Sequence, residues 1–186
     1  STGKDYHSQN WNQTQETLHK NQEFMLTIRQ YVDLLNLLRS GNAYDGKGKQ
    51  LPKAKLDQIL DEIVTVRSPW RSEWLDSKFS KQGRKFHITY HKANQDGTIQ
   101  EVTEPLETCL MIDITPGIEL GHWLNNATTQ GLPVKNTPKG DLYYWSPAEG
   151  TVVRFRADSD WADLDCLGGP SDSDSSLGVR RAKMKI

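Results

Sequence analysis

An α+β fold is predicted by this 186-residue sequence, with helices in the first third and strands in the remainder. Before residue 67, apolar residues recur mostly at three- and four-residue spacing, which is the period of a helix. From about residue 85 onward, apolar and polar residues alternate, as they do in half-buried strands. The length and the hydrophobic fraction of 35% suit one domain with an added helical piece. We therefore predict a helical segment over residues 1–66 and a mainly β domain over residues 67–186.

The N-terminal segment is predicted to hold two helices. The first is expected to start at Thr14 and to stop before Gly41, because these residue types favour those helix ends. Pro52 can open the second helix, which is expected to run to about Val64. The apolar stripes of the two helices hold Leu18, Met25, Ile28, Val32, Leu35 and Leu38, and then Leu56, Ile59, Leu60 and Ile63. Such stripes need cover, so we expect them to pack on the β domain, with a helical oligomer contact as the alternative.

A hairpin is predicted early in the β domain. Residues 85–92 alternate between apolar and polar side chains, which is typical of a strand. Residues 94–97 have the composition of a turn, and residues 98–103 are expected to pair back on the first strand.

The segments around this hairpin give less regular patterns. The spacing of Trp70 and Trp74 predicts a packed turn of helix. Residues 106–114 are mostly apolar and fit a buried strand or a short helix, and residues 118–130 fit a short helix or a loop. Gly and Pro are dense over residues 131–150, so strands there are expected to be short.

Two faces are separated in the segment from residue 151 onward. Val153, Phe155 and Ala157 share one parity, while arginines and aspartates occupy the other. The parity slips near Trp161, which predicts one extra residue as a bulge or tight turn and leaves Trp161 on the core side. After the slip, the apolar parity holds Ala162, Leu164 and Cys166.

The opposite parity and the loop that follows it are predicted to be polar and exposed. The members of this set are Arg156, Asp158, Asp160, Asp163, Asp165, Leu167, Gly169, Asp172 and Asp174. This set contains six aspartates and one arginine, a local balance of −5, whereas residues 67–92 hold seven basic and two acidic residues. The formal charge of −1 for the whole chain therefore hides two opposed patches, which would arise if the two segments face each other.

Catalytic, metal and cofactor sites are not expected. The aspartates alternate along strands and so project in parallel, whereas Ca²⁺ requires converging oxygen ligands. His87 and His91 are four residues apart in a predicted strand, where they share a face at a distance that does not suit zinc. The sequence contains no G-x-S-x-G elbow, no Walker loop and no G-x-G-x-x-G motif.

Nucleic acid and membrane are not expected as partners. The near-neutral charge argues against nucleic acid, and the basic aromatic stretch over residues 67–92 is the alternative. No apolar run approaches the length of roughly 18 residues that a membrane helix needs. Residues 1–10 hold no apolar run, so no signal peptide is expected in this chain.

Several motifs of the C-terminal half resemble the variable region of proteins diversified by retroelements, including those of archaeal viruses. They are Trp145-Ser146-Pro147-Ala148, Val153-Arg154-Phe155, Asp160-Trp161-Ala162, Leu164-x-Cys166, and the tract from Pro170-Ser171 to Leu177-Gly178-Val179-Arg180. The tract from Pro69-Trp70-Arg71 to Trp74-Leu75-Asp76 resembles a segment upstream of that region. The closing tract also resembles the end of formylglycine-generating-enzyme-like C-type lectin domains. The resemblance covers about residues 67–186.

This resemblance implies a C-type-lectin-like fold and a variable region at about residues 150–176. In that family a reverse transcriptase mutates adenines while copying a template repeat, and AAC codons are the main targets. All nine outward residues can arise from AAC by changing its two adenines, whereas Trp161 cannot and is expected to be fixed. The implied role is to bind a protein or cell-surface ligand that varies with the variant. The expected anchors beside Arg156 are Tyr143, Tyr144 and Trp145.

A monomer or a small homo-oligomer is expected, displayed on a virion or on a surface through a partner. Two other functions stay open. One is a calcium-dependent lectin that binds carbohydrate. The other is an oxidase of the formylglycine-generating type, which needs a closely spaced cysteine pair with copper, whereas Cys109 and Cys166 are 57 residues apart.

Overall fold

A large mixed β-sheet forms the centre of the computed structural model, which describes residues 6–45, 47–94, 98–112 and 115–183. Most neighbouring strands are antiparallel, but β6 pairs with β8 and β2 pairs with β9 in parallel. The eight strands run in the order β4 (Ile99–Pro105), β3 (Lys85–Ala93), β2 (Arg71–Gln82), β7 (Val152–Ala157), β8 (Ala162–Gly168), β6 (Leu142–Trp145) and β5 (Thr115–Ile118), with β9 (Leu177–Val179) beside β2. The α+β class is thereby confirmed.

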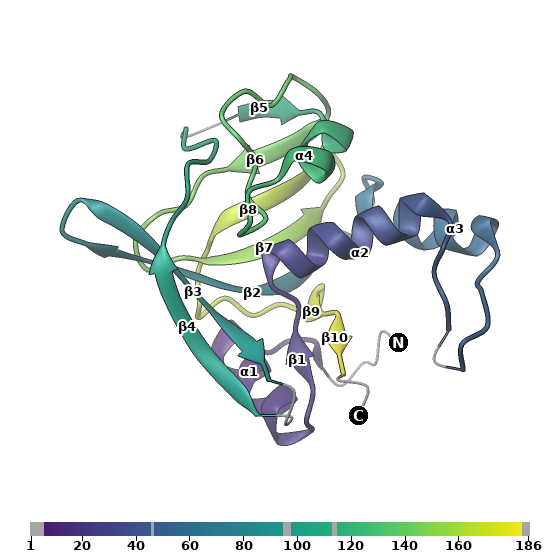
Figure 1. Cartoon of the computed structure of the whole chain (residues 1–186), viewed down its shortest axis with the longest axis horizontal. Helices are drawn as coiled ribbons and strands as arrows, with labels where there is room; N and C mark the ends of the chain where they lie inside the picture. Colours follow the sequence, from purple (N-terminus) through teal and green to yellow (C-terminus); the bar gives the residue numbers. More distant parts are fainter. Residues whose placement is uncertain (1–5, 46, 95–97, 113–114, 184–186) are drawn as a thin grey trace.

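The main core lies between one face of this sheet and three helices, α2 (Ile28–Ser40), α3 (Lys53–Val64) and α4 (Leu120–Asn126). Figure 1 shows α2 and α4 in front of the sheet. The buried stripe of α2, which includes Tyr31 and Leu35, meets the apolar side of β7 and β8. Tyr31 and Phe155 illustrate the contact, with ring centroids 5.4 Å apart. The predicted helical segment and the predicted β domain therefore share one hydrophobic core.

The first predicted helix is divided into two, so the prediction of two helices before residue 66 was wrong. Helix α1 (Trp11–Lys20) ends at Asn21, the short strand β1 (Phe24–Met25) follows, and α2 begins after Thr27. Each helix has its own capping box, in which Asn10 pairs with Gln13 and Thr27 with Gln30. Asn10 is thus the first N-cap, and Thr14 lies inside α1, contrary to expectation.

The predicted ends of the later helices agree better with the structure. Gly41 follows α2 with a φ of 77°, in the left-handed conformation that favours glycine at this position. Pro52 immediately precedes α3, which ends at Val64 as predicted.

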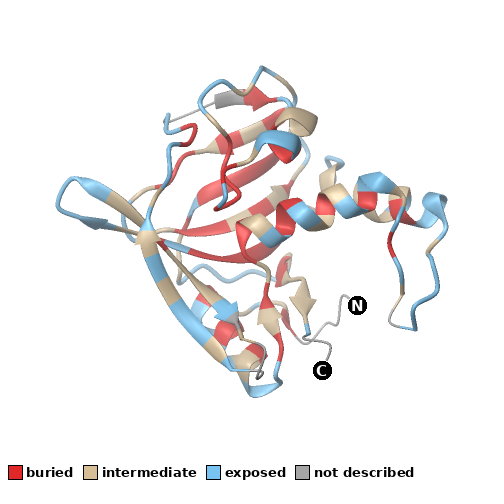
Figure 2. Ribbon diagram, viewed as in Figure 1, coloured by how far each residue is buried: buried red, intermediate tan, exposed pale blue. Residues whose placement is uncertain are grey.

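Helix α1 packs on the other face of the sheet, against the part formed by β2 and β9. Strand β1 pairs with β10 (Arg181–Ala182), which brings the two ends of the described chain together. A second apolar cluster fills this layer and contains Tyr6, Trp11, Leu18, Met25, Trp74, Val152 and Leu177. The red segments of α1 and α2 in Figure 2 mark the buried sides of the helices.

Most of the predicted β elements are confirmed. Strands β3 and β4 form the antiparallel hairpin, although residues 95–97 of its predicted turn lie outside the described residues. Helix α4 lies within residues 118–130, and β6 is a short strand within residues 131–150.

Two predictions about irregular segments were wrong. The tract around Trp74 is the start of strand β2 and not a helical turn. Trp74 faces the α1 layer, while its neighbour Leu75 faces the main core, so both large residues are buried on opposite sides of one strand. Residues 106–112 form neither strand nor helix. Their main chain is held by loop contacts instead, such as the Leu110 amide that donates to the Pro133 carbonyl at 2.6 Å.

Candidate functional site

The open side of strands β6, β7 and β8 carries the candidate site, and the pairing of these strands defines it. In the antiparallel pair of β7 and β8, Arg154 lies opposite Asp165 and Arg156 opposite Asp163. The intervening pair of Phe155 and Leu164 is buried in the core, which confirms the predicted parity of both strands. The slip in parity is accommodated by a turn, in which the Asp158 amide donates to the carbonyl of Trp161 at 3.0 Å.

Strand β6 adds aromatic side chains to the same surface. Its parallel pairing with β8 places Tyr143 beside Asp163 and Trp145 beside Asp165, and both aromatic residues are half-buried. We call this surface the open face. Its members are Tyr143, Trp145, Arg154, Arg156, Asp158, Trp161, Asp163, Asp165 and Leu167.

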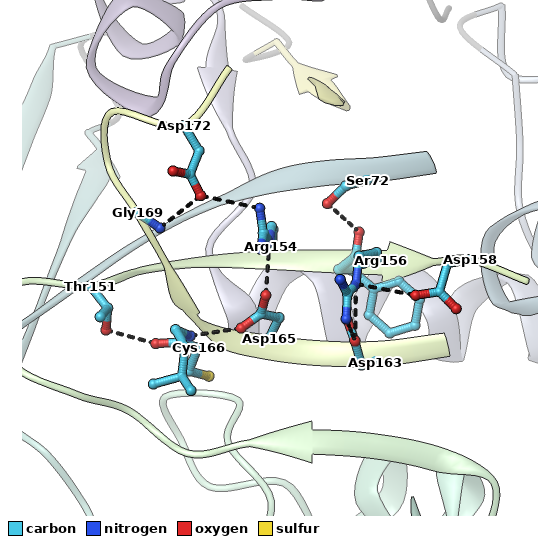
Figure 3. A network of polar contacts seen from close by, with 12 residues as sticks. Ser72, Thr151, Arg154, Arg156, Asp158, Asp163, Asp165, Cys166, Gly169 and Asp172 are labelled. Carbon is cyan, nitrogen blue, oxygen red and sulfur yellow. Dashed lines mark hydrogen bonds and ion pairs between the residues drawn. The ribbon is translucent and has the colours of Figure 1, made fainter. Parts of the chain in front are cut away.

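Ion pairs between arginines and aspartates form the floor of the open face (Figure 3). The guanidinium of Arg156 donates to Oδ2 of Asp163 from Nη2 at 2.6 Å and from Nε at 3.1 Å. Arg154 donates from Nε to Oδ2 of Asp165 at 2.8 Å, and from Nη1 to Asp172 at 3.4 Å. The two arginines therefore neutralise part of the negative charge of this face and its loops, and an excess of aspartates remains uncompensated.

Two of the predicted exposed positions are buried. Asp163 is 0% exposed and Asp165 is 5% exposed, because arginines on the neighbouring strand lie over both carboxylates. Burial raises the pKa of Asp163 and outweighs the opposing effect of Arg156. Burial tends to lower the pKa of Arg156, but its hydrogen bond to Asp163 and that carboxylate's charge raise it overall. The prediction of outward orientation holds for these aspartates, and the prediction of exposure was wrong.

The other predicted positions are more accessible. Arg156 and Asp158 are partly exposed, Asp160, Asp172 and Asp174 are exposed, Gly169 is half-buried, and Leu167 is 41% exposed. The carboxylates of Asp158 and Asp174 stabilise the backbone of the turns around them. Asp158 accepts from the amides of residues 160 and 161, and Asp174 accepts from the Ser176 amide at 2.7 Å. These contacts explain why short acidic side chains suit the turns.

The aromatic residues are distributed differently from the prediction. Tyr144 is 0% exposed and belongs to the main core, so it is not available as an anchor. Trp161 was expected on the core side, but it stacks on Tyr143 with ring centroids 5.0 Å apart. Its indole Nε1 donates to Asp163 at 3.1 Å, so Trp161 belongs to the open face. The alternation pattern placed Trp161 on the wrong side because residue 161 lies in the turn between β7 and β8. In a turn, alternation no longer indicates which face of the sheet a side chain occupies.

A shallow depression of about 290 Å³ opens beside the arginines. It is lined by Trp70, Arg154, Arg156 and Asp158. Trp70 immediately precedes β2, which pairs with β7, and this pairing brings the tryptophan to the arginines. The spacing of Trp70 and Trp74 predicted a packed turn of helix, and nothing in the local sequence indicates that Trp70 lies near β7.

The two cysteines lie on the opposite side of the sheet, in the main core. Both are 0% exposed, and both lie close enough to Tyr144 to affect its ionisation. Burial raises the pKa of Cys109 to about 11 and that of Cys166 well above its ordinary value. Residues 57 apart in sequence therefore become neighbours of one tyrosine, as neutral thiols.

The residue types that bind metals are scattered in the described part of the chain. Across the described ranges, no group of three or more His, Cys, Asp or Glu residues is arranged to hold a metal ion. His91 of the predicted pair instead bonds to Asp76, with Nδ1 and Oδ1 2.9 Å apart. No helix in the described part of the chain has the length and apolar character needed to cross a bilayer.

Comparison with known proteins finds no family model, no curated protein and no solved structure that matches this chain.

Proposed function

We propose that this chain is a ligand-binding protein of the C-type-lectin-like kind, and that retroelement-driven adenine mutagenesis diversifies its open face. The observation that supports this proposal is that the two sides of β7 and β8 differ, one being buried in the core and the other carrying polar residues. Phe155 and Leu164 form the core on one side, while Arg156 and Asp163 face the other side. Such a strand pair separates folding from recognition at its exposed outward positions, because substitutions there usually change stability by no more than about 0.5 kcal/mol.

The proposed site has a supporting layer and a contact layer. Arg154, Arg156 and the two buried aspartates form the supporting layer, since they bond to each other. The contact layer consists of the more exposed residues around it: Tyr143, Trp145, Trp161, Leu167, Asp158, Asp160, Asp172 and Asp174, with Trp70 at the edge. Aromatic side chains commonly supply much of the binding energy at protein interfaces, so Tyr143, Trp145 and Trp161 are the proposed anchors.

The charge of the surface favours a basic protein or cell-surface ligand. The open face and its loops hold six aspartates between residues 158 and 174 against Arg154 and Arg156. This excess of negative charge attracts positively charged surfaces and raises their rate of association, with a strong dependence on salt.

The flanking DNA of the source gene tests the diversification. We expect a near-copy of the stretch that encodes residues 150–176, with AAC at the nine predicted positions, next to a reverse-transcriptase reading frame. Absence of both elements from the surrounding genome would refute the retroelement part and leave an ordinary binding domain.

A combined variant tests the tolerance of the contact layer. Asp160→Tyr, Leu167→Asn and Asp174→Asn together should leave the cooperative unfolding transition intact, because none of these side chains is buried. The matched control is Leu164→Ala, a single core change that should lower the free energy of unfolding by about 2–5 kcal/mol. Unfolding of the triple variant would contradict the proposed separation of folding from recognition.

A further inference from the structure

The segment just before α1 contacts a loop of the proposed site. The Ser8 amide donates to the carbonyl oxygens of Asp174 at 3.1 Å and Leu177 at 3.3 Å. The Trp11 amide donates to the carbonyl of Pro170 at 3.2 Å. His7 adds a fourth contact, with its Nδ1 3.0 Å from the Ser175 carbonyl oxygen. Residues 6–11, which we call the clamp, therefore hold residues 169–177, which we call the loop, at several points along its length.

Every one of these contacts ends on the main chain of the loop. Among the described residues, each hydrogen bond from the clamp to the loop is accepted by a carbonyl oxygen. One loop side chain does meet the clamp, because Leu177 is buried in the apolar cluster that also contains Tyr6 and Trp11. The side chains before it lie elsewhere. Residues 171–175 are exposed, Asp172 bonds to Gly169 and Arg154, and Asp174 bonds to the Ser176 amide. A carbonyl acceptor is present whatever side chain a residue carries, so the hydrogen bonds of the clamp do not depend on the side chains of residues 171–175.

The clamp is fixed by contacts of its own. Trp11 is 6% exposed, and its indole Nε1 donates to the Leu75 carbonyl at 2.9 Å. In return, Nε1 of Trp74 donates to the Gln9 carbonyl at 3.2 Å. Tyr6 is also buried, and its hydroxyl donates to Glu23 at 2.6 Å. These anchors lie on β2 and at Glu23, between α1 and β1, so the clamp has contacts that do not involve the loop.

Two local features show how closely the clamp and the loop fit. A Cβ on Gly178 would lie 2.9 Å from the His7 ring, so a larger residue there would displace that ring. Ser8 has a φ of 60°, the left-handed conformation that is uncommon for a residue with a side chain. This conformation accompanies the double donation of the Ser8 amide to the loop.

We propose that residues 6–11 are an invariant clamp that positions the 169–177 loop through its main chain, so that residues 171–175 can change their side chains and still present them in one conformation. The proposal rests on the proposed function only in calling the loop a binding element. The clamp therefore has a positioning role, although residues 6–11 are far from the loop in sequence. It also explains how a loop of small polar residues stays ordered while its side chains vary.

Hydrogen exchange of the whole chain, measured by mass spectrometry without any ligand, tests the clamp. Ser8→Pro removes the donor and cannot adopt a positive φ, whereas Ser8→Gly keeps the donor and accepts that φ. We expect exchange in the 169–178 peptide to accelerate about tenfold in Ser8→Pro, which is the effect of losing roughly one or two hydrogen bonds. In Ser8→Gly we expect the wild-type rate. The β7 peptide should be unchanged in both variants.

A loop variant tests the independence from side chains. Ser173→Tyr with Ser175→Tyr adds two large groups at exposed positions and leaves every carbonyl in place. Exchange in the loop should stay within about threefold of wild type, because the clamp contacts are retained. If this variant accelerates exchange as much as Ser8→Pro, or if Ser8→Pro matches Ser8→Gly, the proposal is overturned.

A milder variant covers the case in which Ser8→Pro unfolds the whole protein. His7→Ala removes one of the contacts and should accelerate loop exchange about threefold, with no change in β7. An unchanged loop in His7→Ala would then overturn the proposal. Because no ligand is present, failure of the clamp is distinguishable from failure of the binding function, which the flanking DNA and the contact-layer variant test separately.

Discussion

Replacing Asp163 with alanine should destabilise the protein markedly, although the residue lies on the side of the sheet that faces away from the core. The carboxylate is fully buried, and its Oδ2 accepts two hydrogen bonds from Arg156 and one from Trp161. Removing one partner of a buried ion pair typically costs about 3–5 kcal/mol. Here the loss is reduced, because 23% of the Arg156 side chain is exposed and Asp158 remains 3.8 Å away. We expect a decrease of about 2 kcal/mol in the free energy of unfolding.

Urea denaturation at pH 7, followed by tryptophan fluorescence, measures this decrease. The matched control is Asp160→Ala, which removes an exposed aspartate three residues away and should change the free energy by no more than about 0.5 kcal/mol. Asp163→Asn keeps an acceptor for Arg156 and should fall between the two. If Asp163→Ala is as mild as Asp160→Ala, the carboxylate is not a structural partner of Arg156, and the supporting layer of the proposed site does not exist.

Three further predictions concern the core and its titratable groups. Phe155→Ala should lower the free energy of unfolding by about 3–5 kcal/mol in the same urea assay, and a loss below about 1 kcal/mol would contradict its core position. The hydrogen bond to Asp76 raises the pKa of His91, so its stabilising contribution is full below about pH 6.5 and disappears as pH rises through the folded-state value. Stability measured from pH 6 upward should therefore fall less in His91→Gln than in wild type, and identical slopes would refute the assignment. Cys109, with a pKa of about 11, should resist iodoacetamide at pH 8 until urea unfolds the chain, whereas rapid labelling of the folded protein would show that the thiol is accessible.

Local periodicity determined much of the fold. The alternation that predicted β3 and β7 is set by the geometry of an extended chain, so it reports the face of each side chain directly. Glycine at position 41 ended a helix where expected for the same local reason. The division between α1 and α2 was also present in the sequence, as two capping boxes starting at Asn10 and Thr27, but the continuous apolar spacing concealed it.

Contacts between segments that are distant in sequence determine which outward residues are buried and which aromatic residues lie near the site. Alternation correctly directed Asp163 away from the core, but the neighbouring strand supplied the arginine that buries it. Trp161 joins the open face through a turn, and the pairing of β2 with β7 brings Trp70 to the edge of that face. The clamp around Ser8 depends on residues more than 160 positions later in the chain.

The sequence by itself therefore determined the α+β class, the strand hairpin and the two sides of the C-terminal strands. These features depend on dihedral angles and on the burial of apolar stripes, which are properties of short segments. Only the tertiary structure decided which outward residues are exposed, which aromatic residues join them and which segment holds the loop. Burial and hydrogen bonding at such positions depend on strand register and on the packing of remote elements, and a local pattern contains neither.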